Sequence, residues 1–278
     1  MKFSIIVVAL NPGKKLRQTV DSVLAQTWED YEIIVKDGGS TDGSLDSLPE
    51  DGRIRLYREK DGSIYEAMNQ AVAKAQGEYL LFLNCGDAFY DEKVLERAAL
   101  AAEQVRTELK QRSRTKADRE SDENAPLILY GDTYGAKNGV RIAAPKRIDG
   151  FTCYRNIPCH QSCFYERRLC LEKPYNVNYR IRADYDHFLW CYYRAGAKMV
   201  YLDCAVASYE GGGYSESPAN RRRDKEEHRQ ITKEYMRSSE LFRYRAAMWL
   251  TLAPLRSVLA ENKVTAGLYH WVKGMVYR

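Results

Sequence analysis

The sequence predicts an α/β fold: a mostly parallel sheet with helices on both faces, followed by a helical extension at the C-terminal end. Two observations lead to this prediction. Between residues 3 and 83, short runs rich in Ile, Val and Leu alternate with segments whose apolar residues recur at helical spacing. Continuous apolar runs are typical of strands buried on both faces, and their alternation with helices is typical of parallel sheets with right-handed crossovers.

The first part of the chain is expected to supply the centre of this sheet. Its first apolar run stops at Asn11-Pro12-Gly13, which breaks a strand. Gly77 stands where a glycine commonly ends a helix. In order, the expected elements are a strand at 3–10, a helix at 16–26, strands at 31–36 and 54–57, a helix at 64–75 closed by Gly77, and a strand at 78–83.

The second part is patterned less regularly. Residues 111–125 are charged and contain no aromatic residue, which is typical of an exposed loop. Gly211-Gly212-Gly213 is expected to form either a lid over a bound ligand or a plain turn. The other expected elements are a helix at 91–109, strands at 127–130 and 162–165, a helix at 184–195, a strand at 198–202 and a charged helix from Arg221 onward.

The charge is distributed unevenly along the chain. The 278 residues include 43 Lys and Arg against 38 Asp and Glu, a net charge of +5. Residues 237–278 hold seven Lys or Arg and two Asp or Glu, so this segment carries the whole excess. A neutral body argues against nucleic-acid binding, which needs a broad basic face. The sequence predicts a body that binds small molecules and a tail that meets an anionic partner.

The N-terminal residues and the cysteines predict a cytosolic chain with reduced thiols. Met1-Lys2-Phe3-Ser4 runs directly into the first apolar stretch, without the cleavage site of a secretory signal. The seven cysteines do not have the paired spacing of a zinc site. No apolar run approaches the roughly 20 residues that span a bilayer.

Acidic turns follow three of the expected strands. They contain Asp37, Asp61 and Asp87. Ligands of open parallel sheets bind beyond the carboxyl ends of the strands, where carboxylates can contact a nucleotide or hold a divalent ion against its phosphates. Helix capping is an equally weighted alternative for each of these aspartates, and Asp42 fits that role better than a catalytic one. Neither G-x-G-x-x-G nor G-x-x-x-x-G-K-[ST] is present, which weakens dehydrogenase and P-loop interpretations.

Four segments together resemble family 2 glycosyltransferases, especially the branch of exopolysaccharide and O-antigen assembly. The segments are Ser4-Ile5-Ile6-Val7-Val8, Asp37-Gly38-Gly39-Ser40-Thr41-Asp42-Gly43, Asp61-Gly62-Ser63-Ile64-Tyr65-Glu66-Ala67-Met68-Asn69 and Phe82-Leu83-Asn84-Cys85-Gly86-Asp87. The resemblance is specific over residues 3–90, looser over 125–215 and absent beyond about 220. It implies the GT-A fold, a Rossmann-like sheet of the kind predicted above.

The resemblance also implies roles for individual residues. Asp37 would contact the donor's base, Asp61 would lie near the ribose or base, and Asp87 would hold Mg²⁺ or Mn²⁺. Arg182-Ala183-Asp184-Tyr185-Asp186 resembles the motif that carries the general base of inverting members, so Asp184 would be the base. A helix N-cap is the alternative for Asp184. The full set of implied donor-binding residues is Ala9, Asn11, Asp37, Gly39, Asp61, Asn69 and Asn84.

The sequence departs from the family pattern at several of these positions. Asn84 and Gly86 replace the acids of the D-x-D metal motif, and Ala183 replaces the acid before the base. Ala9 and Leu10 stand where a threonine and an aromatic residue are common, which predicts different stacking on the base. The Q-x-x-R-W motif of processive synthases is missing, so a single sugar transfer per acceptor is expected.

Further contacts with the acceptor or diphosphate are expected from His160, Gln161, Asp186 and Tyr214. For His160, a structural role in the interior is the favoured alternative. The predicted domains are a transferase domain at 1–218, with a nucleotide-binding half at 1–90 and an acceptor half at 125–218, and an extension at 219–278. Within the extension, residues 240–278 combine an apolar stripe with Arg and Trp, which fits a helix at a membrane interface or a helix packed on the body.

The sequence therefore predicts an inverting glycosyltransferase that uses a nucleotide-diphosphate sugar, with UDP as the default, and a lipid-linked glycan acceptor in cell-surface polysaccharide synthesis. No nucleic-acid partner is expected. The expected location is the cytoplasm, with the inner face of the cell membrane as the site of peripheral contact. Two alternatives stay open: a sugar-phosphate nucleotidyltransferase, and a catalytically weakened protein that only binds nucleotide sugars.

Overall fold

A computed structural model describes residues 1–112, 124–155, 157–211 and 220–250. The chain forms two compact units, Met1–Ile231 and Thr232–Arg278. The first unit contains the sheet and the helices packed on it, and the second contains the described helix α9, Ser238–Leu250. The predicted domain boundary after residue 218 stays a prediction. Within the described residues, no helix has the length and apolar character needed to cross a membrane.

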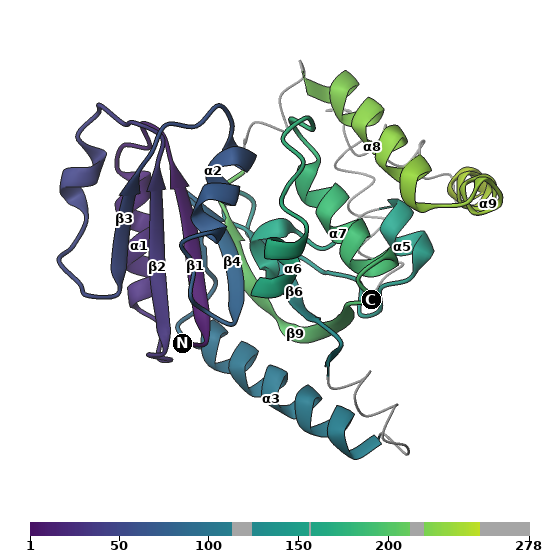
Figure 1. Ribbon diagram of the computed structural model, residues 1–278, viewed down its shortest axis with the longest axis horizontal. Coiled ribbons are helices and arrows are strands. Elements are labelled where there is room, and N and C mark those ends of the chain that lie inside the picture. Colours follow the sequence, from purple (N-terminus) through teal and green to yellow (C-terminus); the bar gives the residue numbers. More distant parts are fainter. Residues whose placement is uncertain (113–123, 156, 212–219, 251–278) are drawn as a thin grey trace. The chain divides into compact units, whose positions relative to one another are not determined.

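The described strands form one nine-stranded sheet in the order β3-β2-β1-β4-β8-β6-β9-β5, with β7 paired to β6 (Figure 1). Strands β1 to β4 are parallel where they pair, whereas β8 runs antiparallel to both of its neighbours, β4 and β6. The strands are β1 (Phe3–Ala9), β2 (Tyr31–Asp37), β3 (Ile54–Arg58), β4 (Tyr79–Asn84), β5 (Ala88–Phe89), β6 (Leu127–Gly135), β7 (Val140–Ile142), β8 (Cys163–Glu166) and β9 (Lys198–Tyr209).

Helices cover both faces of the sheet, as predicted. The helices of the first unit are α1 (Lys15–Leu24), α2 (Ile64–Val72), α3 (Val94–Arg112), α5 (Gly150–Arg155), α6 (Arg167–Glu172) and α7 (Ala183–Tyr193), with the short 3-10 helices η1 (Ser44–Ser47) and η2 (His160–Ser162). Helix α8 (Arg221–Tyr235) extends across the boundary between the units. Figure 1 shows α1 and α2 on opposite sides of β1 and β2.

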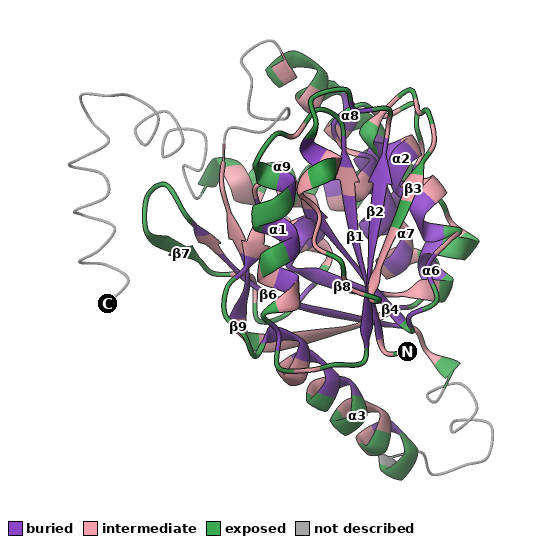
Figure 2. Ribbon diagram, turned by 90° about the vertical axis from the view of Figure 1, so that its left-hand side faces the viewer, coloured by how far each residue is buried: buried purple, intermediate pink, exposed green. Residues whose placement is uncertain are grey.

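The main core lies between the sheet and helices α1 and α3. Alternate residues of β1, including Phe3, Ile5 and Val7, join the same cluster as Leu16 and Val20 of α1. Since successive side chains of a strand point to opposite faces, the residues between them face α2. Figure 2 shows β1, β2 and β4 buried along nearly their whole length. Burial on both faces explains why these strands are continuous apolar runs in the sequence.

Three details differ from the sequence-based expectations. Strands β6 and β9 extend well beyond 130 and 202, with irregular register near Asp132. Helix α2 ends at Val72 with Ala73 as its C-cap, so the prediction of Gly77 as the C-cap is wrong. Gly77 instead lies against β1, where its amide donates to the Ser4 hydroxyl at 2.8 Å. The predicted fold class, an α/β fold with a mostly parallel sheet, is confirmed, and strands β5, β7 and β8 are the antiparallel exceptions.

Candidate active site

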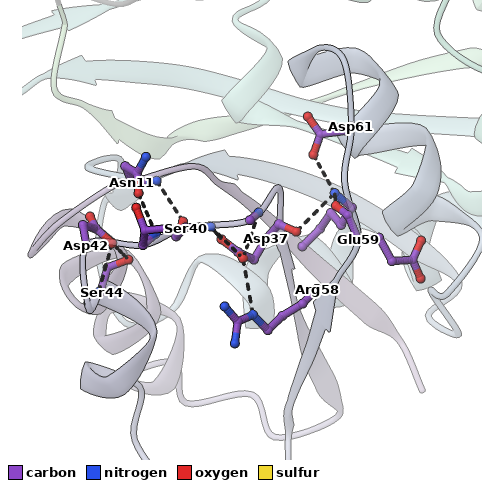
Figure 3. A network of polar contacts seen from close by, with 11 residues as sticks. Asn11, Asp37, Ser40, Asp42, Ser44, Arg58, Glu59 and Asp61 are labelled. Carbon is purple, nitrogen blue, oxygen red and sulfur yellow. Dashed lines mark hydrogen bonds and ion pairs between the residues drawn. The ribbon is translucent and has the colours of Figure 1, made fainter.

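Asp37 ends β2 and shapes the turn that follows it (Figure 3). Its carboxylate is buried and accepts hydrogen bonds from the backbone amides of Gly39 and Ser40, each at 3.0 Å. The Nε of Arg58 on β3 lies 3.7 Å from the same carboxylate. Asp37 therefore fixes the backbone of the predicted donor site through its contacts with Gly39, Ser40 and Arg58.

The loops after β1 and β2 are joined by polar side chains (Figure 3). The backbone N–H of Asn11 donates to the Ser40 hydroxyl at 2.8 Å. The side-chain oxygen of Asn11 accepts from the backbone N–H of Thr41 at 2.9 Å. Asp42 accepts from the amide of Gly13 at 2.8 Å, so it ties the two loops together. These bonds place Asn11, Gly39 and the end of β1 at Ala9 around the same turn.

Asp61 is held by a buried lysine. The Nζ of Lys36 lies 2.6 Å from Asp61 Oδ2 and also donates to the carbonyl of Glu59 at 2.6 Å. The approach of Asp61 to the turn after β2 requires a glycine at position 38, because a Cβ there would lie 2.8 Å from Asp61 Oδ2. Asp61 therefore lies against Gly38, the residue that follows Asp37, as expected if the two aspartates belong to one binding site.

A cavity of about 560 Å³ opens beside the turn that follows β4. It brings together five of the predicted site residues, which come from three separate parts of the chain: Asn84, Asp87, His160, Gln161 and Asp184. Among the described residues, Asn84 Oδ1 and both ring nitrogens of His160 are buried without a hydrogen-bond partner. Since leaving such groups unpaired costs free energy, a polar ligand in the cavity would stabilise them.

Asp87 lies in the wall of this cavity and is 3% exposed. Its Oδ1 accepts from the amide of Glu210 at 2.9 Å, and its Oδ2 accepts from the side chain of Gln161 at 3.2 Å. Burial raises the pKa of Asp87 to about 6, and the nearby Glu210 carboxylate adds to the rise while its backbone amide and Gln161 oppose it. Additional positive charge is therefore favourable at this position.

Lys15 and Glu210 form an ion pair across the cavity mouth, with 2.5 Å between Nζ and Oε2. Glu210 fits there because residue 86 is a glycine: a Cβ at Gly86 would collide with its carboxylate. No group of three or more His, Cys, Asp or Glu side chains that could hold a metal occurs in the described part of the chain. Two carboxylates, Asp87 and Glu210, still suit a Mg²⁺ or Mn²⁺ ion that takes its other ligands from phosphates and water.

Asp184 is the second residue of α7, and the N-cap position belongs to Arg182. The alternative of Asp184 as an N-cap is therefore not what the structure shows. Asp184 Oδ1 lies 3.0 Å from the hydroxyl of Tyr65, a residue of α2, and the same hydroxyl lies 2.6 Å from the carbonyl of Ile181. Both Asp184 and Tyr65 line the cavity.

Glu227 of α8 holds the segment that leads into α7. Its carboxylate accepts from the backbone amides of Arg180, Ile181 and Arg182 at 2.9, 3.0 and 2.9 Å. These amides precede the helix and would otherwise lack partners, so Glu227 acts as a remote N-terminal cap. Glu227 could not be predicted from the sequence, because α8 is charged over most of its length. Only the tertiary structure shows that this carboxylate, among several in the helix, is buried.

His160 lies in η2, and its ring stacks on Phe82 with 5.0 Å between centroids. Burial lowers the pKa of His160, and the negative charge of Asp184 opposes this effect only in part. The side chain is therefore a neutral imidazole in the cavity lining, and its ring nitrogens have no hydrogen-bond partner among the described residues. Ligand contact and a structural role in the interior both stay open for it.

Other predicted residues lie elsewhere. Asn69 uses its side-chain amide on the backbone of Tyr175, with both hydrogen bonds at 2.9 Å, so it links α2 to that segment. Asp186 is 1% exposed and pairs with Lys173 at 3.2 Å. Neither is among the residues that line the cavity, and the same holds for Ala9, Asn11, Asp37, Gly39 and Asp61. The ligand roles of these residues stay predictions. Tyr214 lies outside the described residues.

Asp132 is a second residue that sequence reasoning missed. It is buried at the irregular point of β6 and accepts hydrogen bonds from Arg141 at 2.5 Å, from the Ala144 amide at 2.8 Å and from the Tyr201 hydroxyl at 2.9 Å. These contacts fix the segment of Ile142 to Pro145 that forms one side of the cavity. The available sign in the sequence was an aspartate just after the apolar run at 127–130.

Comparisons with known proteins agree with this geometry. Glycosyl transferase family 2 matches residues 4–168. A PGL/p-HBAD biosynthesis glycosyltransferase of Mycobacterium bovis (strain BCG / Pasteur 1173P2) is 35% identical over 221 residues, which cover 77% of this chain and 78% of the relative.

Two solved structures are similar in fold. The S. aureus TarS 1-349 structure in complex with UDP has a TM-score of 0.58 and 17% identity, over 76% of this chain and 61% of that chain. The mannosyltransferase PcManGT from Pyrobaculum calidifontis, in complex with GDP-Man and Mn²⁺, has a TM-score of 0.59 and 14% identity, over 97% and 83%. Since the family match spans more than half of the sequence, the chain belongs to glycosyl transferase family 2 and is a glycosyltransferase of the GT-A fold.

Proposed function

We propose that this enzyme transfers a single sugar, with inversion, from a nucleotide-diphosphate sugar to a hydroxyl of an acceptor glycan. The observation that carries the proposal is that Asp184 and Asp87 line the same cavity. One carboxylate can take a proton from the acceptor, and the other lies where a diphosphate and its counter-ion would be bound. His160, which is neutral, and Asn84 together supply polar atoms that have no hydrogen-bond partner among the described residues.

In the proposed reaction, Asp184 takes the proton of the acceptor hydroxyl while that oxygen forms a bond to the anomeric carbon of the donor. The bond from the anomeric carbon to the diphosphate oxygen breaks, and its electron pair leaves with the nucleoside diphosphate. Direct displacement inverts the configuration. Lys15, at the cavity mouth, supplies positive charge toward the diphosphate, and Gln161 keeps Asp87 oriented.

A divalent cation held by Asp87 and Glu210 would neutralise charge on the departing diphosphate when bound. The nucleoside is proposed to lie near Asp37 and Asp61, where Gly38 leaves room for the two aspartates to approach each other. UDP is the nucleotide proposed by default. TarS is described in complex with UDP and with UDP-GlcNAc, and PcManGT with GDP-Man and Mn²⁺, which supports a nucleotide sugar of this general kind.

The acceptor is proposed to be a lipid-linked glycan of a cell-surface polysaccharide, reached from the cytoplasmic face of the membrane. The relative from Mycobacterium bovis is named for PGL/p-HBAD biosynthesis, which supports a cell-surface product. Helix α9 exposes Phe242 and Trp249, 74% and 78% exposed, together with the exposed Arg243 and Arg245. Aromatic and basic side chains on one exposed helix suit an anionic membrane surface. Residues 251–278 of the predicted membrane segment lie outside the described residues.

Calorimetric titration with UDP, GDP and dTDP, each with and without Mn²⁺, tests the donor site. Binding of one nucleotide, strengthened by Mn²⁺ and weakened by Asp87→Asn, is the expected result. Absence of binding by folded protein would overturn the proposal. For catalysis, Asp184→Asn should lower kcat by ~10²–10⁴-fold while nucleotide affinity is kept.

Sedimentation with vesicles tests the proposed location. Binding to vesicles rich in phosphatidylglycerol, but not to pure phosphatidylcholine, is expected, and it should fall with added salt because the attraction to anionic lipid is screened. Arg243→Ser with Arg245→Ser should weaken the binding. Equal recovery of the protein in the supernatant with both lipids would contradict membrane contact.

A further inference from the structure

Tyr65 is the residue of α2 that reaches the proposed base. It belongs to the segment Asp61–Asn69 and is 7% exposed. Its hydroxyl has two acceptors within hydrogen-bond distance, the carbonyl of Ile181 at 2.6 Å and Asp184 Oδ1 at 3.0 Å. A phenol has one proton to donate, so it is shared between these two oxygens.

We infer that Tyr65 is a positioning residue for Asp184: its hydroxyl holds Oδ1 and thereby leaves Oδ2 to receive the proton of the acceptor. The inference rests on the proposed role of Asp184 as the base. It also gives the hydroxyl two arrangements. Beside an ionised Asp184 the hydroxyl can donate to Oδ1. Once Oδ2 carries the acceptor's proton, Oδ1 is a weaker acceptor and the hydroxyl can donate to the Ile181 carbonyl instead.

The surroundings keep Tyr65 in this position. Ser63 caps α2 by accepting from the Glu66 amide at 3.2 Å, which fixes the first turn that contains Tyr65. The Ile181 carbonyl belongs to the segment that Glu227 holds through three backbone amides. The hydroxyl of Tyr65 therefore connects two rigid parts of the first unit, and it can set the direction of the carboxylate between them.

Tyr65 stays a neutral phenol at the pH of the reaction. Burial raises the pKa of Tyr65 well above its usual value, and the negative charge of Asp184 raises it further. Titratable or charged groups near the pair come from several elements of the first unit. They include His160, Cys159, Cys163, Tyr165, Tyr175, Glu227 and the ion pair of Arg182 with Asp224. Of these, His160 is also neutral because burial lowers its pKa.

Tyr175 supplies a matched control. Its ring packs against that of Tyr65, with 5.7 Å between centroids, and it is similarly buried. Its hydroxyl has no hydrogen-bond partner among the described residues. Tyr175→Phe and Tyr65→Phe therefore remove the same atom from neighbouring buried rings, and only the second substitution removes a contact with Asp184.

The test measures kcat, KM for the donor and the pH profile of kcat/KM for the wild type and for Tyr65→Phe, Tyr175→Phe and Asp184→Asn. Hydrogen bonds to charged groups contribute about 1.5–3 kcal/mol, so Tyr65→Phe should lower kcat roughly tenfold to a hundredfold with donor KM unchanged. The acidic limb of its profile should move to higher pH, because the lost donor favoured the ionised carboxylate. Tyr175→Phe should leave the limb in place.

The outcomes separate this inference from the proposed function. If Asp184→Asn is inactive and Tyr65→Phe keeps the wild-type pH profile, the positioning role is wrong and the base assignment stands. If Asp184→Asn is active, both are wrong. Should Tyr65→Phe not fold, 3,5-difluorotyrosine placed at position 65 keeps the hydroxyl and makes it a stronger donor. The acidic limb should then move to lower pH, and an unmoved limb would overturn the inference.

Discussion

Lys36 and Asp61 form an ion pair with 2.6 Å between Nζ and Oδ2, and the lysine side chain is only 1% exposed. The pair stands between β2 and the turn after β3, beside the buried Asp37. A lysine so deep in the protein is tolerated because the Asp61 carboxylate and the Glu59 carbonyl both accept from it. The buried ammonium group of Lys36 therefore fixes Asp61 in the predicted nucleoside site.

Lys36→Met should lower the free energy of unfolding by about 3–5 kcal/mol, because it leaves the Asp61 carboxylate, whose side chain is 11% exposed, without its partner. It should also weaken nucleotide binding, since Asp61 loses its fixed position. Urea unfolding and calorimetry measure the two effects. Lys74→Met is the matched control, because Lys74 pairs with Glu59 at the surface, where both side chains are about 40% exposed, and it should change stability by less than about 1 kcal/mol. Equal losses for both variants would contradict the argument.

Gly38→Ala tests the approach of Asp61 to Asp37. The added methyl group would lie 2.8 Å from Asp61 Oδ2, so the aspartate must move. We expect nucleotide affinity to fall roughly tenfold, a change of about 1.4 kcal/mol. Gly52→Ala meets no atom within 4 Å and should leave affinity unchanged. Calorimetry with the nucleotide that binds the wild type measures both, and unchanged affinity in Gly38→Ala would show that Asp61 is not part of the donor site.

Asp87 should make stability depend on pH in the acidic range. Its pKa is raised from 3.8 to about 6 by burial, so the folded protein binds a proton that the unfolded chain has released. The bound proton stabilises the folded protein by roughly 3 kcal/mol. This stabilisation is fully present below about pH 4 and is lost as pH rises through 6. Asp87→Asn should remove this downward slope and abolish nucleotide binding that depends on Mn²⁺.

Urea unfolding of the Asp87 variant between pH 4 and 7 provides the measurement. Asp21→Asn is the control, because Asp21 pairs with Arg17 on the exposed face of α1 and should keep the wild-type slope. An identical slope in the wild type and in Asp87→Asn would show that another group is responsible.

Glu227→Gln should loosen the segment before α7. A glutamine keeps one acceptor oxygen but turns an N–H₂ group toward backbone amides that also donate, so about 1–3 kcal/mol of stability should be lost. Since Asp184 follows this segment, kcat should fall more than donor affinity. The neighbouring Glu226 is exposed and Glu226→Gln should behave as the wild type. A fall in donor affinity without a fall in kcat would argue against this role of Glu227.

The central strands could be predicted from the sequence because burial on both faces leaves a simple pattern. Phe3 to Ala9 and Tyr79 to Asn84 are continuous apolar runs, and the predicted ends lie within a residue of the observed ones. Strands β6 and β9 were predicted too short. Gly131 and Asp132 interrupt the apolar pattern of β6 where the register shifts, and Asp203 interrupts that of β9. Asp132 is buried only because Arg141, Ala144 and Tyr201 satisfy its oxygens, and no local pattern reveals those partners.

The candidate site was predictable where a residue follows a strand or belongs to a motif. Asp87 was predicted from its turn after a strand and from the resemblance, Asp184 from the resemblance alone, and both line one cavity. Lys36, Glu210 and Glu227 are charged residues whose importance depends on contacts with distant parts of the chain. Asn69, in contrast, belongs to a family-like segment but is used to bind the backbone of Tyr175. A motif therefore locates the segment, and the tertiary contacts decide what each side chain does.

The central position of β8 has a consequence for how the chain is made. β4 pairs with β1 on one side and with β8 on the other, so its second edge is covered only by residues 163–166. During synthesis, the first 90 residues leave the ribosome with that edge open, and open apolar edges are sites of wrong pairing between chains. The segment up to residue 90 is therefore expected to be most open to wrong pairing until residues 163–166 have been translated.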